Sequence, residues 1–251
     1  MMIDACVAQH QGDRKEQQDR VALLPHPKGG GMALAVLADG MGGHTGGALA
    51  AQQVLHTAAA NFEQFPVSGE LAGEWLEQSI HEAHTLIRAS RFINEKDPHS
   101  TVVMLLLQPK KASWAHCGDS RLYHFRGERL LFRTKDHSYV EDLVAQGKLR
   151  PDQAQAHPYH HILLSTLGSN ESPQVDVGET SDLRAGDTFV LCSDGLWGYF
   201  SDAELGAAVA ARSARQASDL LIGQARTHAR GSGDNASLVV IKLVQGTGDR
   251  G

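Results

Sequence analysis

The sequence is poor in the residues that nucleic-acid-binding proteins use. Aromatic residues make up only 6% of the 251 residues, and the formal net charge is -6 with no basic block along the chain. Single-stranded nucleic acids stack on aromatic side chains, and phosphate backbones bind clustered lysines and arginines. The composition therefore argues against nucleic acid as the main partner.

Cysteines and long hydrophobic runs are also scarce. The three cysteines, Cys6, Cys117 and Cys192, are far apart, form no CxxC pair and each lie in an apolar stretch. This pattern is typical of reduced, buried thiols in a cytosolic protein. Apolar runs such as Val102–Leu107 are too short to span a bilayer, and the N-terminus shows no signal peptide. We therefore expect a cytoplasmic protein with no membrane partner.

Several ligand-binding motifs are missing. The chain has neither a GxxxxGKS or GxxxxGKT loop nor a GxGxxG, so nucleotide-binding interpretations lack support. HEAH, at His81–His84, lacks the spacing of the zinc motif HExxH, and we expect it on the solvated face of a helix. His157, His160 and His161 have no evident partner cluster, which favours loop histidines over a zinc site.

The remaining composition is that of an ordinary globular protein. Hydrophobic residues make up 41% of the chain, and no linker, low-complexity segment or internal repeat divides it. We expect a single domain over residues 1–245 and a short polar tail over residues 246–251. Strands are predicted over residues 3–9, 20–24, 32–38, 100–108, 112–118, 121–125, 129–134, 187–193 and 236–244.

Helical periodicity accompanies these strands. Residues 46–62 and 70–94 are predicted to be helices, the second from apolar residues at spacings of four, three and four. Ser201 and Ser213 are each followed three residues later by Glu or Gln, which predicts capping boxes at two late helices. The short connections between residues 100 and 134 predict antiparallel neighbours. The order of elements favours packed sheets with helices outside, rather than a βαβ repeat.

Residues 135–185 follow neither pattern consistently. A helix-like DHSYVEDLVAQGKL is followed by HPYHH and by LGSNESPQVDVGE, which carries Gly, Ser and Pro. Long irregular segments of this kind usually lie over functional edges. We therefore expect a short helix inside a long, mobile excursion.

An unusual carboxylate ends one of the predicted strands. In VLADGMGGH, residues 36–44, an apolar run stops at Asp39 and three glycines follow within four residues. Asp-Gly is a common turn, and for this stretch alone a turn is the simpler interpretation. The alternative is a metal site, because glycine lets the backbone approach an ion and offer a carbonyl oxygen.

Four further carboxylates lie at strand edges, and most are flanked by Gly, Ser or Asn. They are Asp19, Asp119, Asp194 and Asp234. Carboxylates gathered at one end of a sheet repel each other and take up protons unless cations bind them. Oxygen-only ligands suit Mg²⁺ or Mn²⁺, and a pair of such ions lowers the pKa of a bridging water that can attack phosphorus. Gly186-Asp187, in RAGDTF, is interpreted as a simple turn.

The ordered series RKEQQD, DGMGGH, GDSR, DHS, SDGLWG and GDNAS resembles the metal-dependent protein phosphatases, the type 2C serine/threonine phosphatases. These motifs span residues 14–237, and the chain looks most like the small bacterial single-domain members. The resemblance implies an α+β fold, a four-layer αββα sandwich of two antiparallel sheets flanked by helix pairs. It also implies hydrolysis of phosphoserine and phosphothreonine by direct attack of a metal-bridging hydroxide.

The resemblance further implies a ligand set for Mn²⁺ or Mg²⁺, with two tight ions and a third, weak one. Asp39 would bridge the two tight ions, and the carbonyl of Gly40 would bind one of them. Asp194 and Asp234 would complete the other. Asp119 would bind the third ion.

Three more residues receive roles from the same resemblance. Asp19 would hold the nucleophilic water or reach a metal through water. Arg14 would grip the phosphate, because its guanidinium fork suits two phosphate oxygens. Asn235 would orient Asp234 without itself binding the metal.

The sequence departs from the family pattern at three positions. Met41 stands where many eukaryotic members have a histidine proposed as general acid, and a thioether cannot donate a proton, although a metal-bound water could. Gln18 stands where several relatives have an acidic residue, which weakens water-mediated metal binding. His160, in HPYHH, stands where bacterial relatives often have Arg, which leaves substrate preference open along with the role of His161.

Two other functions stay open at this point. One is a non-catalytic regulatory module of the same fold, although five acidic positions kept without metal would only cost stability. The other is a phosphatase for a small phosphorylated metabolite. For the favoured protein phosphatase, we expect a monomer whose partners are phosphorylated proteins and which opposes a serine/threonine kinase.

Overall fold

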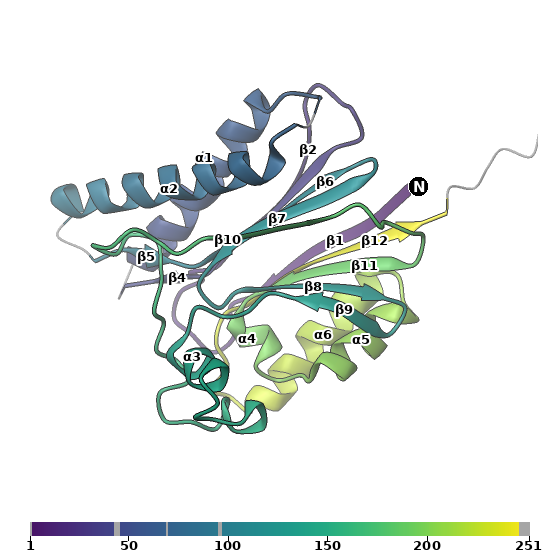
Figure 1. Cartoon of the computed structure of the whole chain (residues 1–251). Helices are drawn as coiled ribbons and strands as arrows, with labels where there is room; N and C mark the ends of the chain where they lie inside the picture. The colour runs from purple at the N-terminus through teal and green to yellow at the C-terminus, as the bar shows by residue number, and fades with distance from the viewer. Residues whose placement is uncertain (1, 43–45, 69, 95–96, 246–251) are drawn as a thin grey trace, which may run out of the picture.

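The computed structural model describes residues 2–42, 46–68, 70–94 and 97–245. The predicted polar tail, and Gly43 and His44 of the first glycine-rich motif, lie outside the described residues. Two five-stranded antiparallel sheets pack face to face, and helices cover the outer face of each (Figure 1). This arrangement confirms the predicted four-layer α+β sandwich.

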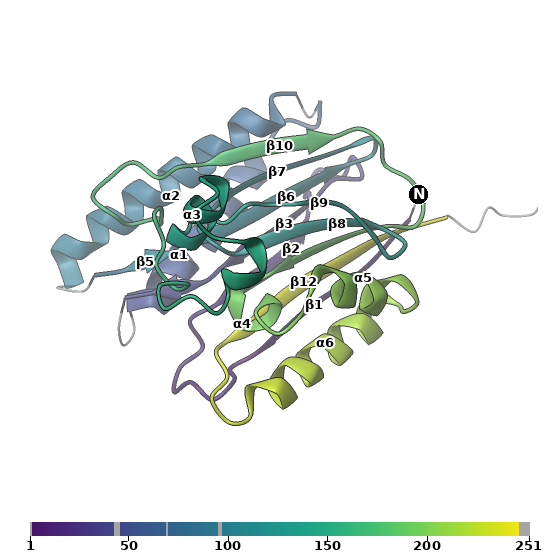
Figure 2. The same ribbon diagram turned by 60° about the horizontal axis from the view of Figure 1, so that its bottom comes forward.

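The first sheet carries the two ends of the described chain. Its strands, in spatial order, are β1 (Met2–His10), β12 (Ala236–Val244), β11 (Asp187–Cys192), β8 (Arg121–Arg126) and β9 (Arg129–Arg133). The helices on this side are α4 (Asp194–Trp197), α5 (Asp202–Ala210) and α6 (Ala214–Ala229). Figure 2 shows α5 and α6 beside this sheet. Both predicted capping boxes, at Ser201 and Ser213, are present at the starts of α5 and α6.

The second sheet is covered by the two long helices. Its strands, in spatial order, are β10 (Asp176–Thr180), β7 (Lys111–Cys117), β6 (Val102–Gln108), β3 (Ala33–Ala38) and β2 (Arg20–Pro25). The helices are α1 (Gly46–Gln64) and α2 (Ala72–Asn94). A small separate sheet pairs β4 (Gly40–Met41) with β5 (His99–Ser100). The apolar residues whose spacing predicted α2, among them Leu76 and Ile80, are all buried.

Buried hydrophobic residues form three clusters that correspond to the three contacts between layers. In β3, Leu34 and Val36 pack toward α1 and α2, whereas Ala35 and Leu37 pack toward the first sheet. Successive side chains in a strand point to opposite faces, so a strand covered on both sides must be apolar throughout. The uninterrupted apolar runs of the sequence therefore mark the central strands.

The predicted excursion contains one helix and returns to the sheet earlier than expected. Its helix α3 (Tyr139–Ala145) and a 3₁₀ turn (Pro151–Gln153) project from the sandwich (Figure 1). The prediction of an excursion up to residue 185 was wrong in one respect, because Asp176–Thr180 is strand β10 and pairs with β7. A five-residue polar strand at a sheet edge gives little periodic signal, so the sequence did not reveal it.

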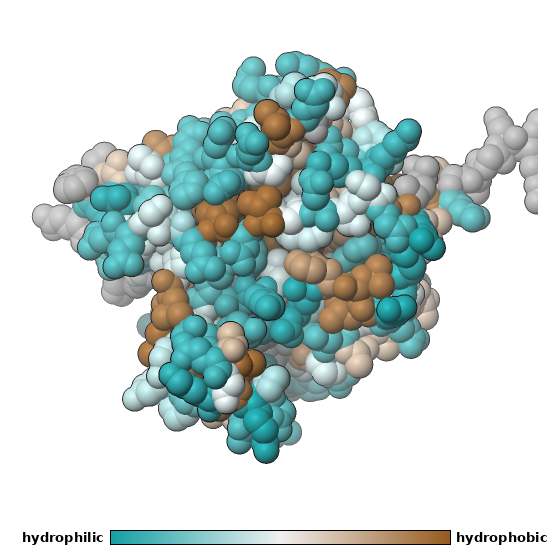
Figure 3. Space-filling model, viewed as in Figure 1, coloured by the Kyte–Doolittle hydropathy of each residue, from teal (hydrophilic) through white to brown (hydrophobic). Residues whose placement is uncertain are grey.

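The outer surface of the excursion carries apolar side chains. Tyr159, Ile162 and Leu164 are 54%, 39% and 56% exposed. Figure 3 shows that hydrophobic residues on this face of the molecule lie in small patches separated by hydrophilic surface.

One predicted strand pairing was wrong. The short connection between β7 and β8 suggested antiparallel neighbours, but the two strands belong to different sheets. Gly118, Asp119 and Ser120 carry the chain from one sheet to the other. The pairings of β6 with β7 and of β8 with β9 are as predicted.

Three predictions about single side chains also need correction. Cys117 and Cys192 are buried as expected, but Cys6 is half-buried because β1 is an edge strand. His84 does not lie on a solvated helix face; it is 5% exposed, and its Nδ1 accepts the Gly168 N–H at 3.2 Å. Asp187 is more than a turn residue, because it is fully buried and accepts hydrogen bonds from the Arg126 guanidinium at 2.6 and 3.1 Å.

Within the described residues, no helix combines the length and the apolar character that crossing a bilayer requires.

Candidate metal centre

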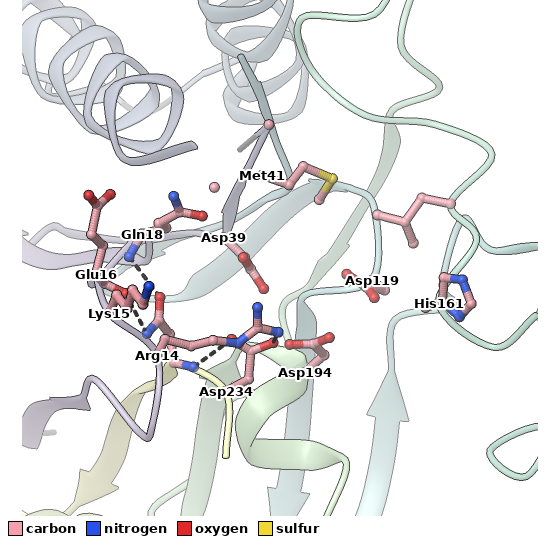
Figure 4. Close-up of a pocket in the computed structure, with 14 residues that line it drawn as sticks. Arg14, Lys15, Glu16, Gln18, Asp39, Met41, Asp119, His161, Asp194 and Asp234 are labelled. Atoms are coloured by element: carbon pink, nitrogen blue, oxygen red, sulfur yellow. Dashed lines mark hydrogen bonds and ion pairs between the residues drawn. The ribbon is translucent and has the colours of Figure 1, made fainter. Parts of the chain in front are cut away.

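Four of the predicted carboxylates converge at one end of the sandwich. Asp39 follows β3, Asp119 lies between β7 and β8, Asp194 begins α4 after β11, and Asp234 precedes β12. All four line a single cavity of ≈ 550 Å³, together with Arg14 (Figure 4). The cavity therefore draws its ligands from both sheets, which explains why residues far apart in the sequence meet there.

The backbone on either side of Asp39 is fixed by a neighbouring threonine. The Asp39 N–H donates to Thr101 Oγ1 at 3.1 Å, and the Thr101 N–H donates to the Asp39 carbonyl at 2.8 Å. These bonds occupy the backbone of Asp39 and leave its carboxylate directed into the cavity. At Gly40, an added Cβ would lie 2.0 Å from the carbonyl oxygen of Gly47. Glycine is therefore required where β4 meets the start of α1.

The turn that carries Asp119 is held from two sides. The indole N–H of Trp197 donates to the Asp119 carbonyl at 2.9 Å. The Ser120 hydroxyl lies 2.7 Å from the Thr101 hydroxyl. Because Thr101 also binds Asp39, the positions of the two carboxylates are linked through one side chain.

Asn235 connects the Asp234 loop to the N-terminal RKEQQD segment. Its Nδ2 donates to the carbonyls of Gln11 at 2.7 Å and Glu16 at 3.0 Å, and its Oδ1 accepts the Gln18 N–H at 2.7 Å. Its own N–H donates to Asp234 Oδ1 at 2.8 Å. Asn235 therefore orients Asp234 and the segment that carries Arg14 at the same time.

Asp19 lies below the cavity and does not line it. It is 1% exposed, and its Oδ2 accepts a hydrogen bond from the Ser193 hydroxyl at 2.9 Å. Its Oδ1 is buried and has no hydrogen-bond partner among the described residues. A buried carboxylate oxygen without a donor is costly. One oxygen of Asp19 is thus available to a water or an ion under the cavity floor.

The electrostatics of the cluster agree with a cation site. Burial raises the pKa of Asp19 to about 7. Burial, followed by repulsion from the neighbouring carboxylates, also raises the pKa values of Asp39 and Asp119 well above their usual range. The pKa of Asp194 rises for the same reason, with Asp234 as the main repelling charge. Carboxylates in this situation favour either protons or bound cations.

The donor set fits divalent cations that prefer oxygen. Among the described residues, the cavity lining includes four aspartate carboxylates and Gly40, with no cysteine and a single histidine, His161. Hard cations such as Mg²⁺ and Mn²⁺ take such ligands, whereas zinc sites usually include imidazole or thiolate. The orphaned buried oxygen of Asp19 and the raised pKa values of its neighbours support the same fit.

Arg14 lies at the rim of the cavity beside Asp234. Its guanidinium forms an ion pair with the Asp234 carboxylate, and 62% of its side chain remains exposed. Figure 4 shows the guanidinium reaching across the cavity toward Asp194. An exposed guanidinium over a ring of carboxylates is placed to bind an anion held between them and the solvent.

The cavity also contains residues to which the sequence gave no role. Lys15 and Glu16 line it beside Arg14, and His161 lines it from the excursion, near Asp119. His160, which the resemblance to the phosphatase family singled out, lines a neighbouring cavity with Trp197 instead. Loop conformation decides which of two adjacent histidines faces the site, so the spacing of the residues could not reveal it.

Comparison with known proteins assigns the family. The family model described as protein phosphatase 2C matches residues 8–224. PhpP, a protein phosphatase of Streptococcus pneumoniae, is 32% identical over 180 residues, which cover 70% of this chain and 72% of PhpP. The chain belongs to the protein phosphatase 2C family.

Another 2C-family relative has a structure with metal. The serine/threonine protein phosphatase PstP of Mycobacterium tuberculosis is 33% identical over 221 residues, which cover 85% of this chain but only 41% of PstP. The catalytic domain of a PstP, solved in complex with two manganese ions, superposes with a TM-score of 0.81 at 27% identity. The match covers 97% of this chain and 99% of that domain. By class, the chain is a metal-dependent serine/threonine protein phosphatase domain of the 2C family.

Proposed function

We propose that this chain hydrolyses phosphoserine and phosphothreonine in proteins at a binuclear Mn²⁺ or Mg²⁺ centre. The observation that carries the proposal is the convergence of Asp39, Asp119, Asp194 and Asp234 from separate strand ends into one cavity, with Arg14 at its rim. Two ions held there lower the pKa of a water between them and neutralise charge on the phosphate.

Each residue has a proposed task. Asp39 would be a ligand of both tight ions, and the Gly40 carbonyl would be a ligand of one of them. Asp194 and Asp234 bind the other ion, with Asp234 oriented by the Asn235 N–H. Bound cations would offset the burial and the mutual repulsion that raise the pKa values of Asp39 and Asp194.

Two further carboxylates complete the proposed centre. Asp19 would orient the water of the metal centre through its unpartnered Oδ1, while the Ser193 hydroxyl donates a hydrogen bond to its other oxygen. Asp119 lies on the side of the cavity nearer to His161 and holds a third, weaker ion. Met41 also lines the cavity and supplies no proton, so the acid for the leaving serine or threonine oxygen must come from elsewhere.

Arg14 binds the substrate phosphate in this proposal. Arg14→Ala should raise KM about 10- to 100-fold and lower kcat less, since a charge-assisted hydrogen bond is worth about 1.5–3 kcal/mol. Arg14→Lys should restore only part of the loss, because an ammonium cannot replace the bidentate fork. Steady-state kinetics on one phosphopeptide measure both variants, and an unchanged KM in both would remove Arg14 from the phosphate site.

The excursion contacts the protein part of the substrate in this proposal, through His161 and the apolar side chains near it. His161→Gln should raise KM for a phosphopeptide about fivefold, the value of one hydrogen bond, and leave p-nitrophenyl phosphate turnover unchanged. His160→Gln is the matched control, because His160 faces the neighbouring cavity. Equal effects of His161→Gln on both substrates would instead place His161 in the chemistry at the metal centre.

The proposal extends to the oligomeric state of the domain, its location and the enzyme that it opposes. The domain acts as a monomer in the cytoplasm, where thiols such as Cys117 stay reduced, and it reverses the work of a serine/threonine kinase. Residues 1–245 form the catalytic unit. Its excursion moves to admit protein substrates.

A substrate panel tests the proposed function. Purified protein with Mn²⁺ should release phosphate from phosphoserine and phosphothreonine peptides with higher kcat/KM than from sugar phosphates or nucleotides. A higher kcat/KM on a small phosphate would favour the metabolite phosphatase instead. No turnover of p-nitrophenyl phosphate at any Mn²⁺ concentration would favour a non-catalytic module.

A further inference from the structure

A second cluster of metal-binding side chains lies outside the cavity described above. His116 is in β7, His137 follows β9 at the start of the excursion, and Asp176 is in β10 at its end. Their ligand atoms all lie within 4.8 Å of one another. None of the three lines the carboxylate cavity.

Strand register and ring packing bring the cluster together. Asp176 is the antiparallel partner of His116 in the pairing of β10 with β7, so the two side chains lie on the same face of the sheet. The rings of His116 and His137 stack with centroids 4.7 Å apart. The Gln174 amide donates to Asp176 Oδ1 at 3.3 Å and holds the carboxylate from outside. Three separate segments therefore bring two imidazole nitrogens and one carboxylate oxygen close together.

The hydrogen bonding of His116 leaves one of its ring nitrogens available as a ligand. It is 2% exposed, and its Nε2 lies 2.8 Å from the Lys135 carbonyl, to which it can only donate. Nδ1 of the neutral ring therefore carries a lone pair, and this atom is buried without a hydrogen-bond partner among the described residues. Metal-binding histidines characteristically donate their second ring N–H to a carbonyl or carboxylate in this way.

His137 supplies the second nitrogen, but metal binding requires a change in its hydrogen bonding. It is 5% exposed, and its buried Nε2 lies 3.5 Å from Asp176 Oδ2 with no hydrogen bond. Burial lowers its pKa, which keeps the ring neutral. Its Nδ1 accepts the Gly118 N–H at 3.2 Å, so the ring proton is on Nε2. Coordination through Nε2 requires the other neutral tautomer, with the proton on Nδ1, so the Gly118 N–H can then no longer donate to this ring.

We propose that His116, His137 and Asp176 bind one Zn²⁺ ion that joins both ends of the excursion to β7. Two imidazoles and one carboxylate suit zinc, which leaves one coordination position for water, whereas Mg²⁺ and Mn²⁺ prefer oxygen ligands alone. Asp176 has a half-exposed side chain, so the ion can enter from solvent. The site does not depend on the proposed phosphatase activity.

Zinc binding must be measured where the carboxylate cavity cannot compete. In the full chain carrying Asp39→Asn and Asp194→Asn, calorimetry should detect one Zn²⁺ site. Adding Asp176→Asn should weaken this site by at least about tenfold, and adding His116→Gln should do the same. Adding His160→Gln, an exposed histidine of the excursion, should leave it unchanged. Zn²⁺ should also raise the melting temperature of the double variant, but not when Asp176→Asn is added.

Two results would overturn the proposal. One is that the Asp39→Asn, Asp194→Asn protein binds no Zn²⁺, or binds it with equal affinity after Asp176→Asn is added. The other is loss of zinc on His160→Gln alone, which would assign the ion to the exposed histidines of the excursion. Asp176→Asn changes a half-exposed side chain, so the measurement does not rely on the buried His116→Gln variant folding.

Discussion

Asp39→Asn and Asp194→Asn should each lower phosphatase turnover by at least about 10³-fold while the protein stays folded. Metal-ion charge stabilisation supplies several kcal/mol, and each 1.4 kcal/mol is about a factor of ten in rate. Both side chains line the cavity and pack in none of the three hydrophobic clusters. Steady-state kinetics at saturating Mn²⁺ measure the loss, and circular dichroism checks the fold.

The same variants should be more stable than the wild type when metal is removed. The folded-state pKa of Asp19 is about 7, against a usual 3.8. Between these values the folded protein holds a proton that the unfolded chain has lost, so the free energy of unfolding falls as the pH rises. Replacing Asp194 removes a charge that repels Asp19 and should reduce this fall. The turnover prediction has its own contradicting result. Near-normal turnover of either variant at saturating Mn²⁺ would place the metal centre elsewhere.

Asp119→Ala should abolish most phosphopeptide turnover and leave two tightly bound ions in place. Asp119 is the carboxylate proposed to hold the third, weaker ion, which would supply an acid for the leaving oxygen. The loss should be about 10²-fold or more on a phosphoserine peptide, which is typical of a missing general acid. It should be smaller on p-nitrophenyl phosphate, because a phenolate leaves without a proton. The ratio of the two kcat losses is the measurement.

A turn residue would behave differently at position 119. If Asp119 only caps its turn, Asp119→Ala should cost about 1 kcal/mol of stability and little activity. The Trp197 indole already holds the turn through the backbone carbonyl of residue 119, which the substitution keeps. Wild-type kcat on the phosphopeptide, with two tight ions confirmed by calorimetry, would therefore support the turn and contradict the ligand.

The carboxylate cluster could be predicted because its residues end strongly patterned strands. Asp39 and Asp194 follow the apolar runs of β3 and β11, which are central strands of different sheets and finish at the same end of the sandwich. Repulsion between clustered carboxylates then predicts bound cations from the sequence alone. The depth of Asp19 could not be predicted, because its burial depends on Ser193, which lies 174 residues away in the sequence.

The other incorrect predictions concern positions that are set by contacts between residues far apart in the sequence. The link from β7 to β8 is as short as a hairpin turn, and only the packing of two sheets shows that it crosses between them. His84 is buried and accepts the N–H of Gly168, which lies 84 residues away in the sequence, in the return path of the excursion. His160 and His161 are adjacent and chemically identical, so only the loop geometry distinguishes them.

Metal dependence is the most direct test of the central claim, which is that the carboxylates hold the ions that make this domain a phosphatase. Phosphate release from a phosphoserine peptide should vanish in excess EDTA. It should return with Mn²⁺ or Mg²⁺ and return poorly with Ca²⁺, which is larger and less demanding of octahedral geometry. Full activity in excess EDTA would contradict the account.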